Sequence, residues 1–270
     1  MGHGSDIRNL ETTATYDPTT KEWIIDSPTA SSAKYWPGEL GLYANYAMVF
    51  AQTIIKGKNH GVNPFLVPIR DEHFNCLPGV EGGDIGPKIG FHAKDNGYMY
   101  FRNVRVPKHS LFTKYVEVSD EGDYKQVGDP RVGYGTMMFI REGISVNIPK
   151  MFAVTIIIAA RYSFFRRQGL GQGGEERNIL EYQTQQEKVL ARLAEYYALT
   201  IAGLKIREIC RRNGEKVMKD DFSLLQETHS NLTFSKCLFS EICQDGMEIL
   251  RRSMGGHGTS YYSGLPQMMN

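Results

Sequence analysis

The fold of the C-terminal half is set by the stretch LQETHSNLTFSKCLFSEICQDGMEI, residues 225–249. Small and apolar residues recur in it in alternating steps of three and four, at Leu225, Thr228, Leu232, Ser235, Phe239, Ile242, Gly246 and Ile249. A helix with this spacing presents one continuous face, which is typical of packing between antiparallel helices. We therefore expect a helical bundle whose core includes this face, and we assign the face no chemistry.

Two further helices are expected upstream of this stretch. The first covers roughly residues 136–167. The second runs from about residue 180 to residue 212 and ends before Gly214, with basic residues in its last turn. The second helix carries an apolar stripe with the same spacing, which we also expect to face the bundle: Leu190, Leu193, Tyr197, Ile201 and Leu204.

A glycine-rich segment separates these two helices. Gly169, Gly171 and Gly174 satisfy the G-x-G-x-x-G pattern of dinucleotide-binding folds. That pattern requires a strand before it and a helix after it, so that a pyrophosphate meets the helix N-terminus. Because the preceding element here is a long helix, we expect a break between helices and no Rossmann site.

The first 115 residues show the patterns of β-strands. Runs rich in β-branched and aromatic residues alternate with glycine and proline turns, at 12–16, 23–25, 48–55, 65–67, 98–101 and 104–106. Such frequent turns predict a small antiparallel β-barrel or sandwich. The sequence thus predicts an α+β chain, with a β-domain in residues 1–115, a polar linker in 116–132 and an antiparallel α-helical bundle in 133–270.

Composition excludes several classes of function. A net charge of +1 gives no reason to expect a nucleic acid partner. The most apolar run, residues 151–160, is about half the length that a bilayer requires, so we expect no membrane span. The four cysteines form no C-x-x-C pair, so we expect free thiols and no metal site.

Six segments together resemble the acyl-CoA oxidases of the acyl-CoA dehydrogenase superfamily. In order, and covering essentially the whole chain, they lie at residues 2–7 (GHGSDI), 10–17 (LETTATYD), 34–38 (KYWPG), 161–168 (RYSFFRRQ), 183–186 (QTQQ) and 254–258 (MGGHG). The second and third segments resemble the oxidase branch specifically.

This resemblance implies FAD as the cofactor and assigns it residues in the β-domain. Gly38 is the strongest expected flavin contact, because glycine lets a planar ring approach the backbone, and Trp36 and Pro37 lie beside it. Ser5, in a glycine-rich segment that could form a nest of backbone amides, is the next. From the residues alone, Trp36 is equally a core residue before a Pro-Gly turn.

The resemblance also assigns cofactor residues in the helical domain. Arg166 corresponds to an arginine that approaches the FAD pyrophosphate, a role that suits its bidentate guanidinium. A solvated helix end is the alternative, since Arg167 is equally available. Gly255 and Gly256 resemble a turn that lies against the FAD of a neighbouring subunit, and they can also cap a helix. His257 is expected to form hydrogen bonds and not to act as the base.

The implied activity is oxidation of fatty acyl-CoA to trans-2-enoyl-CoA, with electrons passed to O2 to give H2O2, by a homodimer in peroxisomal β-oxidation. An acyl-CoA dehydrogenase, or a non-catalytic flavin-binding or structural relative, are the alternatives. The reaction needs a buried carboxylate as base, which the family places downstream of the Gly-Gly-His-Gly motif. Residues 249–270 contain no Asp or Glu. We therefore assign no catalytic residue and expect the base to lie beyond Asn270, the N-terminal helical domain to be missing, and the 270 residues alone to be inactive.

Overall fold

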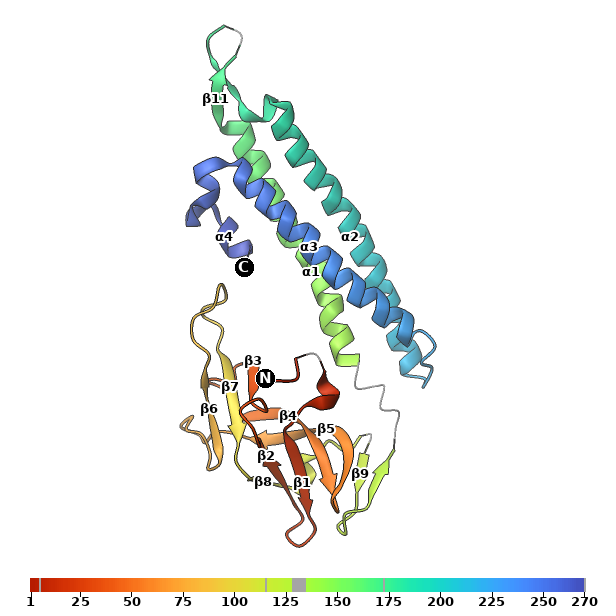
Figure 1. Cartoon of the computed structure of the whole chain (residues 1–270). Helices are drawn as coiled ribbons and strands as arrows, with labels where there is room; N and C mark the ends of the chain where they lie inside the picture. Colours follow the sequence, from red (N-terminus) through yellow and green to blue (C-terminus); the bar gives the residue numbers. More distant parts are fainter. Residues whose placement is uncertain (5, 115, 128–134, 172, 270) are drawn as a thin grey trace. The chain divides into compact units, whose positions relative to one another are not determined.

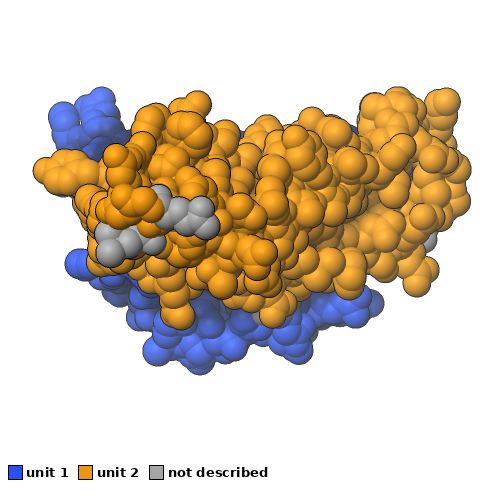
Figure 2. Space-filling model, turned by 90° about the horizontal axis from the view of Figure 1, so that it is seen from above, with its two compact units in different colours: residues 1–130 blue, residues 131–270 orange. Residues whose placement is uncertain are grey.

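A computed structural model describes residues 1–4, 6–114, 116–127, 135–171 and 173–269. The chain divides into two compact units, residues 1–130 and residues 131–270, which are coloured separately in Figure 2. The first unit is built from strands and the second mainly from helices. The α+β class that the sequence predicts is confirmed.

Two larger sheets form most of the β unit (Figure 1). The five-stranded sheet has the order β5-β4-β1-β2-β8, with β1 at Thr13–Asp17, β2 at Glu22–Asp26, β4 at Tyr46–Ile55, β5 at Lys58–Pro68 and β8 at Val104–Pro107. The three-stranded sheet has the order β3-β7-β6, with β3 at Lys34–Gly38, β7 at Asn96–Phe101 and β6 at Val80–Asp84. Neighbouring strands of both sheets are antiparallel, except that β1 and β4 are parallel.

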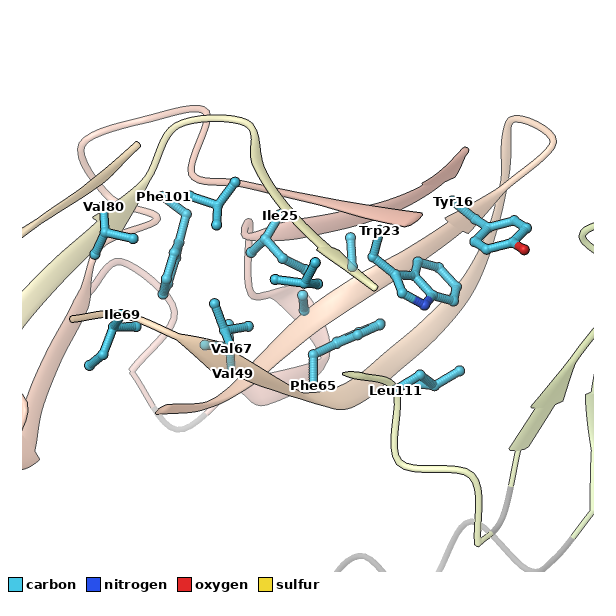
Figure 3. Close-up of a cluster of buried hydrophobic side chains, with 14 of the residues drawn as sticks. Tyr16, Trp23, Ile25, Val49, Phe65, Val67, Ile69, Val80, Phe101 and Leu111 are labelled. Carbon is cyan, nitrogen blue, oxygen red and sulfur yellow. The ribbon is translucent and has the colours of Figure 1, made fainter. Parts of the chain in front are cut away.

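Side chains from both sheets meet in one core, as in a sandwich. Trp23 is fully buried, with its ring centre 4.9 Å from that of Tyr16 and 5.0 Å from that of Phe65 (Figure 3). The indole Nε1 donates a hydrogen bond to the carbonyl oxygen of Lys108 at 3.2 Å, so its one polar atom is satisfied. Phe101, from the three-stranded sheet, is buried in the same cluster.

The β unit extends past residue 115, into the segment expected as a polar linker. Residues Val116–Val118 form β9 and Tyr124–Gln126 form β10, an antiparallel pair. Val116 and Val118 are buried in the core of the β unit, while Glu117 between them is exposed. Glu117 thus occupies the exposed face of β9, and Asp120 and Glu121 lie in the turn after it. The polarity of the segment therefore does not indicate that it contains a short alternating strand.

Three helices run side by side in the second unit: α1 at Gly135–Phe165, α2 at Gln183–Val217 and α3 at Leu225–Ser253 (Figure 1). The face expected of α3 is in the core, since Thr228, Leu232, Ser235, Phe239 and Gly246 are buried. The expected end of α2 before Gly214 is wrong. The helix continues to Val217, because one glycine inside a helix costs only about 1 kcal/mol.

Of the apolar stripe expected on α2, Leu193 packs against the bundle core, but the other four residues are exposed. Leu190, Tyr197 and Ile201 are each 59% exposed and Leu204 is 54% exposed. The buried face lies beside it and includes Val189, Leu199 and Gly203. Two neighbouring stripes on this helix share the three-four spacing, so spacing alone does not tell which one meets α1 and α3.

Helix α1 is longer and more apolar than the run at 151–160 suggested. In the described part of the chain it alone, over Met138–Phe165, is long and apolar enough to cross a membrane, with an 18-residue window of mean hydropathy 1.7. The core helix of a bundle meets the same criterion, and Phe152, Ile156 and Ala159 of α1 are buried against the other helices. Length and composition are therefore weak evidence for a membrane span.

Glycines let the three helices approach closely. Pro149 inside α1 has no N–H, so the carbonyl of Ser145 loses its donor in the helix. Gly203 of α2 packs against this carbonyl, where a Cβ would come within 2.9 Å of the oxygen. In α3, a Cβ at Gly246 would lie 2.5 Å from the ring of the fully buried Phe152.

A methyl group at Gly246 is therefore expected to destabilise the bundle. We expect G246A to lower the free energy of unfolding by about 1–3 kcal/mol through overpacking. The matched control is G214A in α2, where a Cβ meets nothing within 4 Å and the gain in helix propensity is about 0.5–1 kcal/mol. Thermal and urea unfolding of both variants measure the difference, and equal effects in the two would contradict this packing.

Candidate functional site

One cavity of about 740 Å³ lies in the helical unit, where the end of α1, the beginning of α2 and the end of α3 meet. Arg166, directly after α1, borders it together with Gly255 and Gly256, directly after α3. Three of the residues expected to bind a cofactor thus come together from distant parts of the sequence. Arg167 does not border the cavity, although its sequence position made it an equal candidate.

The cavity is surrounded by positive charge. Arg166, Lys188 and Arg252 border it, and none of the residues that border it is acidic. Within the described part of the chain, Arg166 and Lys188 form no ion pair, whereas Nε of Arg252 lies 2.6 Å from a carboxylate oxygen of Glu248. Cations left without acidic partners around a cavity favour an anionic ligand.

Glu248 holds the basic residues at the end of α3. Its carboxylate accepts hydrogen bonds from Nε and Nη2 of Arg251, each at 2.7 Å, as well as the one from Arg252. Hydrogen bonds from Arg251 and then Arg252 lower the pKa of Glu248 to about 2. Only Arg252 of the two borders the cavity, so Glu248 fixes a cation at its edge.

The N-terminus of α2 adds a further attraction for anions. Thr184 and Gln185, in the first turn of this helix of 35 residues, both border the cavity. Tyr182 at the N-cap position makes no side-chain capping hydrogen bond. The first amides of a helix and its dipole favour negative charge at this end.

The turn after α3 is open toward a ligand. Gly255 has a φ of +60°, which favours glycine, and a Cβ at Gly255 or Gly256 would meet no atom within 4 Å. Gly258 is the tight position of the turn, since a Cβ there would lie 2.0 Å from the carbonyl oxygen of Arg251. Side chains at 255 and 256 would therefore narrow the cavity, while Gly258 allows the turn to pack on α3.

Several residues that border the cavity were not assigned a role from the sequence. They include Gln185, Lys188, Arg252 and Tyr182. Gln185 and Lys188 are three residues apart, so they share a helix face beside Arg166, and Arg252 lies just before the glycine pair. The fold of the chain between them, which brings three helix ends together, was needed to find them.

The glycine-rich segment at 169–174 is not a dinucleotide fingerprint. Its first glycine, Gly169, belongs to β11 (Arg167–Leu170), which follows α1 and pairs antiparallel with β12 (Glu176–Asn178). Gln168 and Gly169 of this hairpin border the cavity. The segment therefore contributes one wall of the site as a hairpin.

In the β unit, Trp36 is displayed at the surface. It is 59% exposed, so the alternative that it is a core residue is wrong. Its φ is +87°, and the pairing of β3 with β7 is irregular between Tyr35 and Gly38. The side-chain amide of Asn96 donates a hydrogen bond to the carbonyl oxygen of Trp36 at 2.7 Å, which fixes this strained conformation. Bulges re-aim side chains, and strain of this kind clusters at functional sites.

The neighbours of Trp36 are also exposed at the end of β3. Pro37 and Gly38 follow it, and a Cβ at Gly38 would lie 2.5 Å from Cε of Lys94. The space that glycine leaves is thus used by the Lys94 side chain, which pairs with Glu39. Ser5 lies outside the described residues.

Cysteine and metal chemistry receive no support in the regions that the structure describes. There, no three His, Cys, Asp or Glu side chains are grouped as metal ligands would be. Cys76, Cys210, Cys237 and Cys243 are free thiols. Burial raises the pKa of the Cys243 thiol to about 12, which makes it unreactive.

Comparison with known proteins relates this architecture to one family. Residues 134–270 match the family model for the acyl-CoA oxidase C-alpha1 domain. The chain belongs to the acyl-CoA oxidase family. The family resemblance stated from the sequence motifs is therefore confirmed.

Individual acyl-CoA oxidases resemble the chain over both units. Peroxisomal acyl-coenzyme A oxidase 1 of Pongo abelii is 42% identical over 99% of this chain and 41% of its own length. For oxidase 2 of Mus musculus the identity is 42%, over 100% of this chain and 40% of its own length. Acyl-CoA oxidase 1 of Arabidopsis thaliana superposes with a TM-score of 0.95 at 36% identity, over 99% of this chain and 42% of that structure.

A structure of acyl-CoA oxidase-2 from Caenorhabditis elegans, bound with FAD, ascaroside-CoA and ATP, superposes with a TM-score of 0.94 at 38% identity, over 99% of this chain and 41% of that one. The chain spans about two fifths of the length of the curated relatives it matches.

The ion pairs of Glu248 predict how the free energy of unfolding depends on pH. Its pKa is about 2 in the folded chain against 4.5 ordinarily, so its contribution to stability is full above about pH 4.5 and is lost as the pH falls through 2. We expect E248Q to lower the free energy of unfolding at pH 7 by about 0.5–1 kcal/mol. The difference from the unmodified chain should shrink between pH 4.5 and 2.

Urea unfolding at a series of pH values measures this difference. The control is the substitution E241Q. Glu241 is an exposed residue of the same helix and forms no ion pair in the described part of the chain. A stability difference for E248Q that stays constant down to pH 2, or one that E241Q reproduces, would show that Glu248 is not held by the two arginines.

Proposed function

We propose that the chain is the central part of a peroxisomal, FAD-dependent acyl-CoA oxidase. In this proposal the whole protein is a homodimer that converts fatty acyl-CoA to trans-2-enoyl-CoA and passes the electrons to O2, giving H2O2. Residues 1–115, with β9 and β10, are its middle β-domain, and residues 133–270 belong to its C-terminal helical domain. The names of the relatives, which include peroxisomal oxidases and an oxidase bound with FAD, support the oxidase activity, the peroxisomal location and the cofactor in this proposal.

The observation that carries the proposal is the cationic cavity at the helix ends. FAD contains a diphosphate, and Arg166, Lys188 and Arg252 with the N-terminus of α2 provide charge and hydrogen-bond donors suited to it. Gly255 and Gly256 leave the neighbouring space free of side chains. The residues present therefore fit the diphosphate part of the cofactor.

The exposed end of β3 is proposed to meet the flavin ring. Trp36 offers an apolar face, held outward by its strained backbone, and Pro37 and Gly38 extend the same exposed segment. Ser5 is proposed as a further contact on the strength of the G-x-G-S-D resemblance. When bound, the flavin supplies the hydride acceptor, and this chain contributes binding and orientation.

Replacing Arg166 tests the cofactor site directly. We expect R166Q to weaken the binding of FAD and ADP by roughly tenfold, because a charge-assisted hydrogen bond contributes about 1.5–3 kcal/mol. R167Q removes the same charge from the adjacent exposed position, which does not border the cavity, and should leave affinity within about twofold. Isothermal titration calorimetry at fixed ionic strength compares the two variants. Equal losses of affinity in R166Q and R167Q would show that the effect comes from the net charge of the chain and not from a contact at the cavity.

Turnover assays test the reaction itself. We expect the 270-residue chain, supplied with FAD and a fatty acyl-CoA, to form no enoyl-CoA, because residues 249–270 hold no carboxylate and none borders the cavity. The protein extended to include the carboxylate that the family places downstream of the Gly-Gly-His-Gly motif should consume O2 and release H2O2 with the same substrate. Turnover by the extended protein that requires an electron acceptor and yields no peroxide would favour the dehydrogenase alternative.

A further inference from the structure

One buried amide connects the three helices beneath the cavity. Gln185, in the first turn of α2, is only 7% exposed and borders the cavity. Its Nε2 lies 2.8 Å from Oγ of Ser163 in α1 and 3.2 Å from Oγ of Ser253 in α3. No role was assigned to this residue from the sequence, although it belongs to one of the segments that carry the family resemblance.

The hydrogen bonds of the two serines determine the orientation of this amide. The hydroxyl of Ser163 donates its proton to the carbonyl oxygen of Ala159 at 2.7 Å. The hydroxyl of Ser253 donates its own to the carbonyl oxygen of Leu250, also at 2.7 Å. Each hydroxyl has one proton, so both serines can only accept hydrogen bonds from Gln185. The group that meets them must therefore be the NH2 of the amide.

This orientation leaves one polar atom of Gln185 for a ligand. Both amide protons are used by the serines, so Oε1 is the remaining atom, and it is an acceptor. The other polar side chains considered at this cavity, Arg166, Lys188 and Arg252, are donors. An inorganic phosphate or diphosphate at neutral pH is mostly an acceptor, so it matches the cations and the hydroxyl donors at the cavity but not Oε1. Oε1 requires a partner that carries an O–H or N–H group.

We infer that Gln185 is a specificity-determining residue, whose Oε1 accepts a hydrogen bond from a hydroxyl or amino group of a nucleotide whose phosphates meet Arg166, Lys188 and Arg252. The inference rests on the proposed function and deepens it. The cations provide affinity for any polyphosphate, and Gln185 distinguishes a nucleotide from inorganic diphosphate. A ligand without a donor covers Oε1 without giving it a hydrogen bond, so such a ligand gains less from this site.

The test compares two ligands on three proteins. The chain, Q185M and Q186M are titrated with ADP and with inorganic pyrophosphate by isothermal titration calorimetry. Methionine keeps the length of the side chain but lacks both amide groups, and Gln186 is an exposed neighbour that does not border the cavity. We expect Q185M to weaken ADP binding about five- to tenfold, as the loss of one hydrogen bond implies. Loss of the hydrogen bonds to the two serines affects both ligands alike, so the deciding quantity is the ratio of ADP affinity to pyrophosphate affinity. This ratio should fall about five- to tenfold in Q185M and stay unchanged in Q186M.

Two ADP analogues identify the donor. If a sugar hydroxyl meets Oε1, 2′,3′-dideoxy-ADP should bind the chain and Q185M equally well. If the adenine amino group does, inosine diphosphate should show this equality instead. Either result supports the inference.

Other outcomes would overturn the inference. Equal weakening of ADP and pyrophosphate in Q185M would reduce Gln185 to a structural role, and unchanged ADP binding would remove it from the site. Thermal unfolding of Q185M without ligand separates a loss of fold from a loss of recognition. Failure of the proposed cofactor site is seen separately, since R166Q would then leave pyrophosphate binding unchanged.

Discussion

The amide of Gln185 is the constraint on which the helical half of the site depends. Ser163, Gln185 and Ser253 lie at the end of α1, the beginning of α2 and the end of α3, and the hydrogen bond between Gln185 and Ser163 is buried. A buried polar group that loses its partner costs about 1–3 kcal/mol, so the three helix ends are held in one register. That register brings Arg166, Lys188 and the Gly255–Gly256 turn around one cavity. The geometry of the cavity therefore depends on the uncharged hydrogen bonds between Gln185 and the two serines.

In the β unit, the corresponding constraint is the core around Trp23. Tyr16 and Phe65 pack against this indole, and Phe101 from the second sheet is buried in the same core, so the core fixes the two sheets against each other. A rigid core of this kind allows one strained segment at the surface, since residues in sparsely populated backbone conformations cost about 1–3 kcal/mol each. Trp36 is such a residue, held at a φ of +87° by the irregular pairing of β3 and β7 and by Asn96. An exposed indole in a strained backbone is better explained by recognition than by folding.

Elements with strong periodicity could be predicted from the sequence, and those whose identity depends on neighbours could not. The alternating strand at 48–55 and the buried face of α3 are recovered because one pattern fits each of them. On α2 two stripes fit, and the more apolar one proved to be the exposed one, because Gly203 and Val189 pack where Leu204 and Leu190 were expected. Of the residues that border the cavity, Arg166, Gly255 and Gly256 could be named from the sequence because they lie in motifs. Gln185 and Lys188 could not, since their role arises only where three helices meet.

The charges around the cavity are better explained by ligand binding than by the stability of the fold. Glu248 partly neutralises Arg252, but Arg166 and Lys188 have no acidic partner in the described regions and share a cavity with it. Like charges gathered in this way oppose folding, and the positive end of α2 adds to them. If these three residues only stabilised the fold, neutral side chains would serve as well. A solvated helix end likewise does not require three cations around one cavity beside an open glycine turn. Neutralising the cations by an anion that also satisfies Oε1 of Gln185 removes both costs at once, which is the physical case for a nucleotide at this position.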